Sequence, residues 1–203
     1  MSTTPAPAPG PTRRTGPETR AAILRVALEL FTKQGYDATS MRQVAEVLGI
    51  RKASLYYHFA GKEEIVRSLF AQRGDEAEQL LKWVVAQPRT IELVKAAVLR
   101  WVDSFSADKL HGLRFLSANP LLVRSLTAQH DNRIGSALAE LVDALVALLP
   151  HRTAVDALQL RMALLSINAA VQASAQGDFT DEEIVAAARR GATVLVDALV
   201  ERG

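Results

Sequence analysis

Residues 31–70 read FTKQGYDATSMRQVAEVLGIRKASLYYHFAGKEEIVRSLF, and the middle of this stretch decides the fold. It contains two short helical segments, 40–48 and 51–58, joined by a turn of a few residues. Helices joined so closely pack at a steep angle, which requires a small residue where they touch and a residue that tolerates positive φ at the turn. Ala45 supplies the first and Gly49 the second. The stretch therefore predicts a helix-turn-helix.

Local signals at the helix ends support this prediction. Ser40 can cap the first helix, and Gln43 three residues later completes a capping box. We expect Phe59 to be a core residue, since it lies where the second helix must dock. The apolar residues expected to fill the angle between the two helices are Val44, Leu48, Ile50 and Leu55.

The other face of segment 51–58 gathers hydrogen-bonding and aromatic side chains, which is unusual for a surface. These are Lys52, Ser54, Tyr56, Tyr57 and His58. Such side chains suit phosphate oxygens and base edges, and a helix fits the major groove of DNA. Lys62 adds an ammonium group at the start of the next helix, where backbone N–H groups already favour an anion.

In these residues the stretch resembles the amino-terminal domain of the tetracycline-repressor (TetR) family. The family pattern is F-x-x-x-G-Y, then T-[ST]-hydrophobic-x-x-[IV]-A, then G-hydrophobic-x-x-x-x-[LI]-Y-x-[HY]-F-x-x-K-[ED]. The matching residues are Phe31, Gly35, Tyr36, Thr39, Ser40, Val44, Ala45, Gly49, Leu55, Tyr56, His58, Phe59, Lys62 and Glu63. The resemblance covers about a quarter of the chain.

The resemblance implies which side chains contact operator DNA. Those expected to hold phosphates are Thr39, Ser40, Tyr57, His58 and Lys62. Those expected to face base edges are Arg42, Lys52, Ala53 and Tyr56, with Ser54 on the same surface. Many family members have Ser, Thr or Asn as the N-cap of the recognition helix, where this chain has Arg51. The cap is weaker by about 0.5–2 kcal/mol, and an extra cation faces the groove.

Outside this stretch, apolar residues recur at three- and four-residue spacing and strand patterns are nearly absent, so we expect an all-α protein. The architecture should be an N-terminal three-helix helix-turn-helix domain and a C-terminal helical bundle, with about nine helices in total. The expected helices span residues 17–35, 40–48, 51–58, 62–85, 90–105, 108–118, 120–149, 153–176 and 181–201. Gly177 should end the eighth of these, and Thr180 with Glu183 should cap the ninth.

Composition narrows the functional class. The absence of cysteine excludes disulfides and thiolate metal sites, and no apolar run reaches the roughly 18 residues that span a bilayer. We therefore expect a cytoplasmic protein without membrane contact. Residues 1–62 carry a net charge of +5 and residues 63–203 a net charge of −3, which favours a polyanion-binding module joined to another domain.

Catalysis and metal binding have little support in the sequence. The four histidines, at 58, 111, 130 and 151, are isolated from one another and from paired carboxylates. We find no catalytic triad and no glycine-rich loop. The sequence therefore predicts no enzyme activity, no cofactor and no metal.

Three regions are expected along the chain. Residues 1–15 are rich in Pro and Ala and should form a disordered extension. Arg13 and Arg14 in it either reach into a minor groove or are simply solvated. Residues 16–61 should form the DNA-binding domain, and residues 62–203 the ligand-sensing and dimerisation domain.

The predicted ligand site combines large rings and polar groups of the second domain. Trp101 and Phe105 lie on one face of the fifth helix, and Phe115 is a further large ring. Arg161, Asn168 and Gln172 repeat on one face of the eighth helix, together with Leu165. This polar strip either lines a pocket or belongs to a dimer interface, and the sequence does not separate the two.

Selective DNA binding requires two half-sites, so we expect a homodimer on a palindromic operator. The resemblance places the dimer contact on the last two helices. The apolar residues expected there are Val155, Leu158, Met162, Leu165, Ile184, Val194, Leu195, Ala198 and Leu199. A lipophilic small-molecule inducer would tilt the fourth helix and release a repressor from DNA. The alternatives are a ligand-independent or protein-partnered DNA-binding protein of the same fold and, with least support, a helical enzyme.

Overall fold

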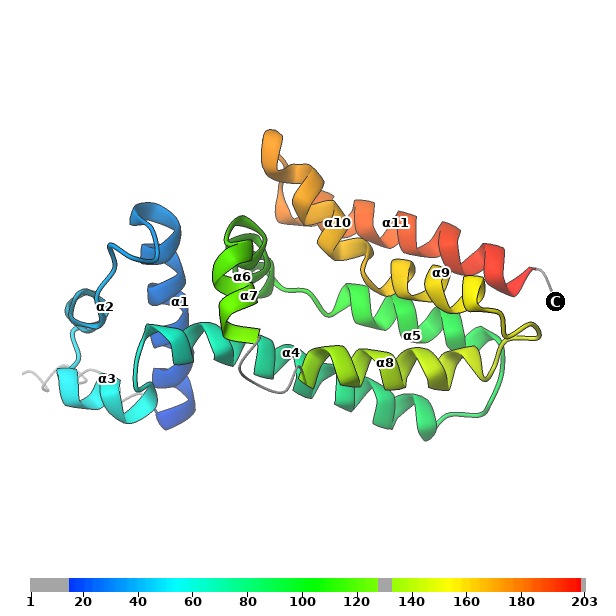
Figure 1. The fold of residues 1–203 in the computed structure, drawn as a ribbon, viewed down its shortest axis with the longest axis horizontal. Coiled ribbons are helices and arrows are strands. Elements are labelled where there is room, and N and C mark those ends of the chain that lie inside the picture. Colours follow the sequence, from blue (N-terminus) through cyan, green and yellow to red (C-terminus); the bar gives the residue numbers. More distant parts are fainter. Residues whose placement is uncertain (1–14, 128–132, 202–203) are drawn as a thin grey trace, which may run out of the picture. The chain divides into compact units, whose positions relative to one another are not determined.

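In a computed structural model, residues 15–127 and 133–201 are described, and they are helical without any strand (Figure 1). The chain divides into two compact units, Met1–Lys62 and Glu63–Gly203. The all-α architecture with an amino-terminal helix-turn-helix is therefore confirmed. The predicted extension 1–15, with Arg13 and Arg14, lies outside the described residues except for Thr15, and His130 also lies outside them.

The first unit contains α1 (Gly16–Gln34), α2 (Met41–Leu48) and α3 (Lys52–His58). The capping box of Ser40 and Gln43 is present at the start of α2. The Ser40 side chain accepts from the Gln43 backbone N–H at 3.2 Å, and the Gln43 carboxamide oxygen accepts from the Ser40 backbone N–H at 2.8 Å. The buried residues are Ala22, Ile23, Ala27, Leu28, Phe31, Thr39, Met41, Val44, Ala45, Leu55 and Phe59.

The turn between α2 and α3 depends on a left-handed residue. Gly49 has φ +64° and ψ +29°, and its N–H donates to the carbonyls of Ala45 and Glu46. A residue with a Cβ would be strained in this conformation. The predicted role of Gly49 is confirmed, and Val44 on α2 and Leu55 on α3 are both fully buried.

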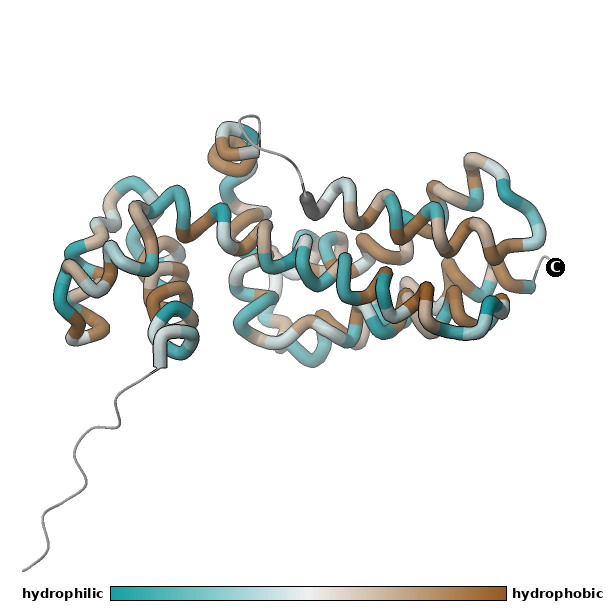
Figure 2. Tube along the Cα trace, turned by 90° about the horizontal axis from the view of Figure 1, so that it is seen from below, coloured by the Kyte–Doolittle hydropathy of each residue, from teal (hydrophilic) through white to brown (hydrophobic). Residues whose placement is uncertain are grey.

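The second unit is a helical bundle whose helices carry alternating polar and apolar residues (Figure 2). Its first helix, α4, begins at Lys62, the last residue of the first unit. The helices are α4 (Lys62–Val85), α5 (Glu92–Asp103), α6 (Ala107–Ala118), α7 (Pro120–Thr127), α8 (Arg133–Val146), α9 (Ala154–Leu164), α10 (Ser166–Ala173) and α11 (Asp181–Val200), with a short 3-10 helix at Ser174–Gln176.

Helix α11 organises the bundle, because it packs against α5, α9 and α10. Ion pairs fasten it to its neighbours. Lys95 on α5 pairs with Asp197 at 2.6 Å, and Arg114 on α6 pairs with Asp181 at 2.6 Å. The capping box predicted for Thr180 and Glu183 is present at its start.

One of the predicted helices is divided, and another is described only on either side of a gap. Residues 120–149 form α7 and α8, with residues 128–132 outside the described part. Residues 153–176 form α9 and α10, which are bent by 51° at Leu165. The Asn168 N–H bonds to the Leu165 carbonyl at 3.0 Å, as in a tighter turn. Gly177 follows the 3-10 helix in an extended conformation, so it is not the left-handed cap that a glycine there predicts.

The break at Leu165 has an identifiable cause. The indole N–H of Trp101 on α5 donates to the Leu164 carbonyl at 3.0 Å. A donor inserted from a neighbouring helix competes for a carbonyl that would otherwise accept within the helix, and such insertions bend helices. The prediction of one continuous helix is wrong because this donor comes from a distant part of the chain.

Within the described residues, no single helix is long and apolar enough to cross a membrane. The bent pair Ala154–Leu164 and Ser166–Gln176 reaches the necessary length and composition only when its two parts are taken together.

Candidate nucleic-acid interface

Most of the predicted DNA-contacting residues lie at the surface of α2 and α3. Ser54, His58 and Lys62 are half-buried, and Thr39 is buried. The exposed ones are Ser40, Arg42, Arg51, Lys52, Ala53, Tyr56 and Tyr57. The two helices therefore expose polar and aromatic side chains on the side opposite their apolar core.

The aromatic residues of α3 are the most unusual part of this surface. Tyr57 is 86% exposed and Tyr56 is 44% exposed. The Tyr57 ring packs edge-on against the His58 ring, with centroids 5.2 Å apart. The Lys52 ammonium lies 5.6 Å from the centre of the Tyr56 ring, within the range of a cation–π contact. Exposed rings with adjacent cations match the chemistry of base edges and phosphates.

Arg51 begins α3 without capping it. It occupies the N-cap position in an extended conformation, and its side chain makes no cap hydrogen bond. This agrees with the weak cap that its residue type predicts. The guanidinium is therefore not held by the end of its own helix.

Arg42 on α2 is occupied within the chain. Its Nε donates to the Glu46 carboxylate at 2.7 Å, one helical turn later, and both side chains are exposed. The bond to Glu46 raises the pKa of Arg42. Exposed pairs of this kind contribute little to stability, so a DNA acceptor can replace Glu46 at small cost.

Thr39 is not at the surface, which corrects its predicted role. Its side chain is 1% exposed. The hydroxyl donates to the Gly35 carbonyl at 2.8 Å and accepts from the Gln34 side chain at 3.1 Å. These bonds hold the loop between α1 and α2, so the hydroxyl is not available to a phosphate.

Lys62 has a structural role that the sequence did not reveal. Its ammonium donates to the carbonyls of Tyr36 at 2.6 Å and Asp37 at 3.3 Å, and it lies 4.6 Å from the centre of the Tyr36 ring. It joins the start of α4 to the loop after α1. An ammonium group has three donors, so these two carbonyls leave one for a phosphate.

The structure does not bring the predicted ligand-binding residues together. Trp101, Phe105 and Phe115 are buried. Arg161, Asn168 and Gln172 are exposed on α9 and α10. Of the two interpretations of the polar strip, exposure disfavours a pocket within the chain and favours an interface.

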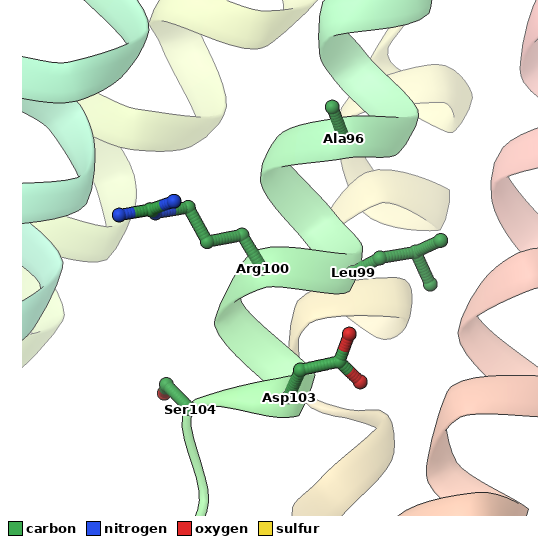
Figure 3. Close-up of a pocket in the computed structure, with 5 residues that line it drawn as sticks. All are labelled: Ala96, Leu99, Arg100, Asp103 and Ser104. Carbon is green, nitrogen blue, oxygen red and sulfur yellow. The ribbon is translucent and has the colours of Figure 1, made fainter.

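A groove of about 550 Å³ lies elsewhere, along α5 (Figure 3). Its lining residues are Ala96, Leu99, Arg100, Asp103 and Ser104. The Arg100 side chain points away from Asp103, which pairs with Arg189 on α11. None of the lining residues was predicted as a ligand contact.

Arg73 on α4 stacks against the predicted aromatic pair. Its guanidinium carbon lies 4.0 Å from the centre of the Trp101 ring and 3.9 Å from that of Phe105. It forms an ion pair with Glu76, which also binds the Lys109 ammonium at 2.9 Å. Sequence reasoning missed Arg73, because a lone arginine in a helix reads as a surface residue.

The apolar residues predicted for the dimer contact divide into two groups. Ile184 and Leu199 are 3% exposed and belong to the chain's own core, so their placement in an interface is wrong. Leu195 and Ala198 are half-buried. The large exposed members are Val155, Leu158, Met162, Leu165 and Val194, which lie on and beside α9 and on α11.

The described part of the chain contains no group of three or more His, Asp or Glu side chains that could hold a metal ion.

Residues 23–69 match the family described as bacterial regulatory proteins, tetR family. Over 87 residues the chain is 33% identical to the HTH-type transcriptional regulator SrpR of Pseudomonas putida. That alignment covers 43% of this chain and 41% of SrpR. Over 72 residues it is 40% identical to the HTH-type transcriptional repressor KstR2 of Mycobacterium tuberculosis. That alignment covers 36% of this chain and 32% of KstR2. Each match spans less than half of the relative. Both relatives are named as regulators, not enzymes.

Two known structures resemble the chain along most of its length. The KstR2 structure, described as a ketosteroid transcriptional regulator, has a TM-score of 0.61 at 19% identity and covers 89% of this chain and 94% of that one. A SmeT–triclosan complex has a TM-score of 0.63 at 16% identity and covers 91% of this chain and 90% of that one. At these identities the likeness establishes the fold.

Proposed function

Because the amino-terminal domain of this chain belongs to the tetR family of bacterial regulatory proteins, we propose that the protein is a cytoplasmic transcriptional repressor that binds a palindromic operator as a dimer. The observation that carries the proposal is the exposed surface of α3. Tyr56 and Tyr57 are exposed beside Lys52, on a helix whose other face is anchored by the fully buried Leu55. Nothing in the stability of the domain requires tyrosines to face solvent, whereas a major groove would cover them.

Within this surface the roles divide by chemistry. Lys52 and Tyr56 are proposed to contact base edges, with Arg51 adding a cation at the start of the helix. Tyr57 and Lys62 are proposed to hold phosphates. Base contacts carry sequence selectivity, whereas phosphate contacts contribute equally on all sequences and weaken with salt.

Dimerisation is proposed through the exposed apolar side chains of α9 and α11. Leu158 is 59% exposed, Met162 is 52% exposed and Val194 is 70% exposed, which leaves large apolar groups in water in a single chain. Exposed apolar side chains that gather on adjacent helices mark interaction surfaces. Arg161 on α9 and Asn168 on α10, both exposed, would supply the polar contacts of this interface.

Release by a small molecule is the remaining part of the proposal. The SmeT structure of the same fold is a complex with triclosan. In this chain α4 continues from Lys62 into the second unit, so a ligand-dependent shift of α4 could reach the DNA-binding domain. Only a ligand that binds the released form more tightly can produce such a shift.

The test is binding to the DNA upstream of the protein's own gene. Footprinting with purified full-length protein should protect a near-palindromic site, and fluorescence anisotropy should give an affinity at least about a thousandfold above that for random duplex. Equal affinity for both duplexes would contradict operator recognition. Selective binding that no small molecule reverses would favour a ligand-independent regulator.

A further inference from the structure

Arg73 is a buried cation with an unused donor. Only 13% of its side chain is exposed, and one guanidinium nitrogen, Nη1, donates to the Glu76 carboxylate. The other, Nη2, is fully buried and has no hydrogen-bond partner among the described residues. Unpartnered buried donors are uncommon, because each leaves a desolvation cost that no bond offsets. Nη2 is therefore positioned for an acceptor that the described part of the chain does not supply.

In the ion-pair cluster around Arg73, the positive charges outnumber the negative ones. One oxygen of Glu76 accepts from Arg73, and the other accepts from the Lys109 ammonium at 2.9 Å. A single carboxylate thus serves two cations, each less than a quarter exposed. Burial lowers the pKa of Arg73 to about 10, against the opposing effect of Glu76, and the guanidinium stays protonated at neutral pH. A second anion would offset the remaining positive charge.

The surroundings restrict which anion fits. The Arg73 guanidinium lies over the rings of Trp101 and Phe105, which are perpendicular and 6.1 Å apart between centroids. Both rings belong to the hydrophobic core of the second unit. An apolar environment disfavours strongly hydrated ions such as phosphate dianions. It favours a singly charged carboxylate on an apolar body, whose planar geometry also suits a guanidinium.

We propose that Arg73, flanked by Trp101 and Phe105, binds the carboxylate of a small, apolar monocarboxylic acid. A carboxylate oxygen accepts from Nη2, and the apolar body of the acid packs beside the two rings. This inference deepens the proposed sensor function by naming the ligand class. It rests on that function for the effect of the acid on DNA binding.

Trp101 provides the measurement. The chain has two tryptophans, so Trp83→Phe leaves Trp101 as the only indole reporter. Full-length Trp83→Phe protein is titrated with sodium octanoate, with octanamide and with inorganic phosphate. We expect a saturable fluorescence change with octanoate and binding about tenfold or more weaker for octanamide, which lacks the charge. Phosphate should give no saturable change.

Two substitutions separate binding from a purely structural role. Arg73→Met should abolish the octanoate response. Arg100→Met removes an arginine that stacks on residue 83 rather than on Trp101, so it should leave the response unchanged in the same background. Glu76→Gln frees Nη1 and removes the competing carboxylate, so it should tighten octanoate binding by about tenfold. If the cluster served stability alone, both Arg73→Met and Glu76→Gln would lower thermal stability, and they would not change the affinity for octanoate in opposite directions.

Three results would overturn the proposal: no saturable response to octanoate, equal binding of octanoate and octanamide, or unchanged affinity in both the Arg73 and the Glu76 variants. Operator binding is measured separately on the same proteins. If the protein fails to bind octanoate but still binds the operator, only this inference is refuted. Octanoate binding that leaves operator affinity unchanged would keep the site and refute its role as a sensor.

Discussion

The indole N–H of Trp101 donates to the Leu164 carbonyl at 3.0 Å, although the two residues are 63 positions apart in the chain. The bond joins α5 to the point where α9 gives way to α10. Arg73 stacks on the ring of Trp101, the donor of this bond. The helix that ends at Leu164, the acceptor, carries the exposed Leu158 and Met162. A buried cation and an exposed apolar surface are thus connected through one side chain.

Removing this bond should weaken the fold measurably. Trp101→Phe keeps a ring in the core but leaves the Leu164 carbonyl without its indole donor, so we expect the free energy of unfolding to fall by about 1–3 kcal/mol. Urea unfolding followed by circular dichroism measures the change. Trp83→Phe is the matched control, since the Trp83 ring is only half-buried. An equal loss in both variants would mean that ring volume, not the hydrogen bond, matters.

Base reading by α3 can be tested with Lys52→Ala and Tyr56→Ala. Each should reduce operator affinity while leaving random-duplex affinity nearly unchanged, with about 1–3 kcal/mol of discrimination lost for each. Lys33→Ala, an exposed lysine at the end of α1, is the charge-matched control. A parallel loss on operator and random duplex would assign both residues to the phosphate backbone.

Lys62→Ala should behave differently. It removes a cation that also bonds to the Tyr36 and Asp37 carbonyls, so affinity for every duplex should fall alike. The slope of log affinity against log salt should become shallower by about one unit. Titrations at several salt concentrations measure it. An unchanged slope with a lower melting temperature would mean that Lys62 only holds the loop after α1.

Leu158→Glu should dissociate the proposed dimer. Leu158 is 59% exposed in the single chain, so a charge there should change the stability of the monomer by less than about 0.5 kcal/mol. In an interface the same charge would be buried without a partner. Sedimentation velocity should show a monomer with reduced operator affinity. Leu121→Glu, on the 80% exposed Leu121 of α7, is the control and should sediment as the parent does.

Acid sensitivity should depend partly on Glu183. The backbone N–H of Thr180 and the hydroxyl of its side chain hold the pKa of Glu183 below its ordinary value of 4.5. Stability from a carboxylate with a lowered pKa is present above that ordinary value and is lost as the pH falls through the lowered one. Glu183→Gln should therefore flatten the dependence of melting temperature on pH below about pH 4.5. An unchanged dependence in the Glu183→Gln protein would contradict this role for Glu183.

The parts of the fold that could be predicted are those set by neighbours in sequence. Ser40 and Gln43 are three residues apart, and Gly49 determines its own turn, so the helix-turn-helix could be inferred from the local pattern. The bend at Leu165 could not, because its donor lies on another helix and neither proline nor glycine marks the place.

The candidate sites show the same division. Helical spacing places Arg161, Asn168 and Gln172 on one face, but spacing alone does not say whether that face is inside or outside, and it is exposed. Thr39 fits a surface motif, yet its hydroxyl bonds to Gly35 and Gln34 within the loop. Arg73 has no local signal at all, because its environment is built from α4, α5 and α6 together.

The uncapped start of α3 has a consequence for the energetics of recognition. Its seven residues follow Arg51, which makes no capping bond, whereas capping boxes begin α1, α2, α9 and α11. Such a short helix is marginal on its own, so its amide protons should exchange with solvent faster than those of α2. If contact with DNA orders this turn, the negative heat-capacity change of binding would be larger than the contact area alone produces. The affinity for DNA would then depend more strongly on temperature than it would with a recognition helix that is already rigid in solution.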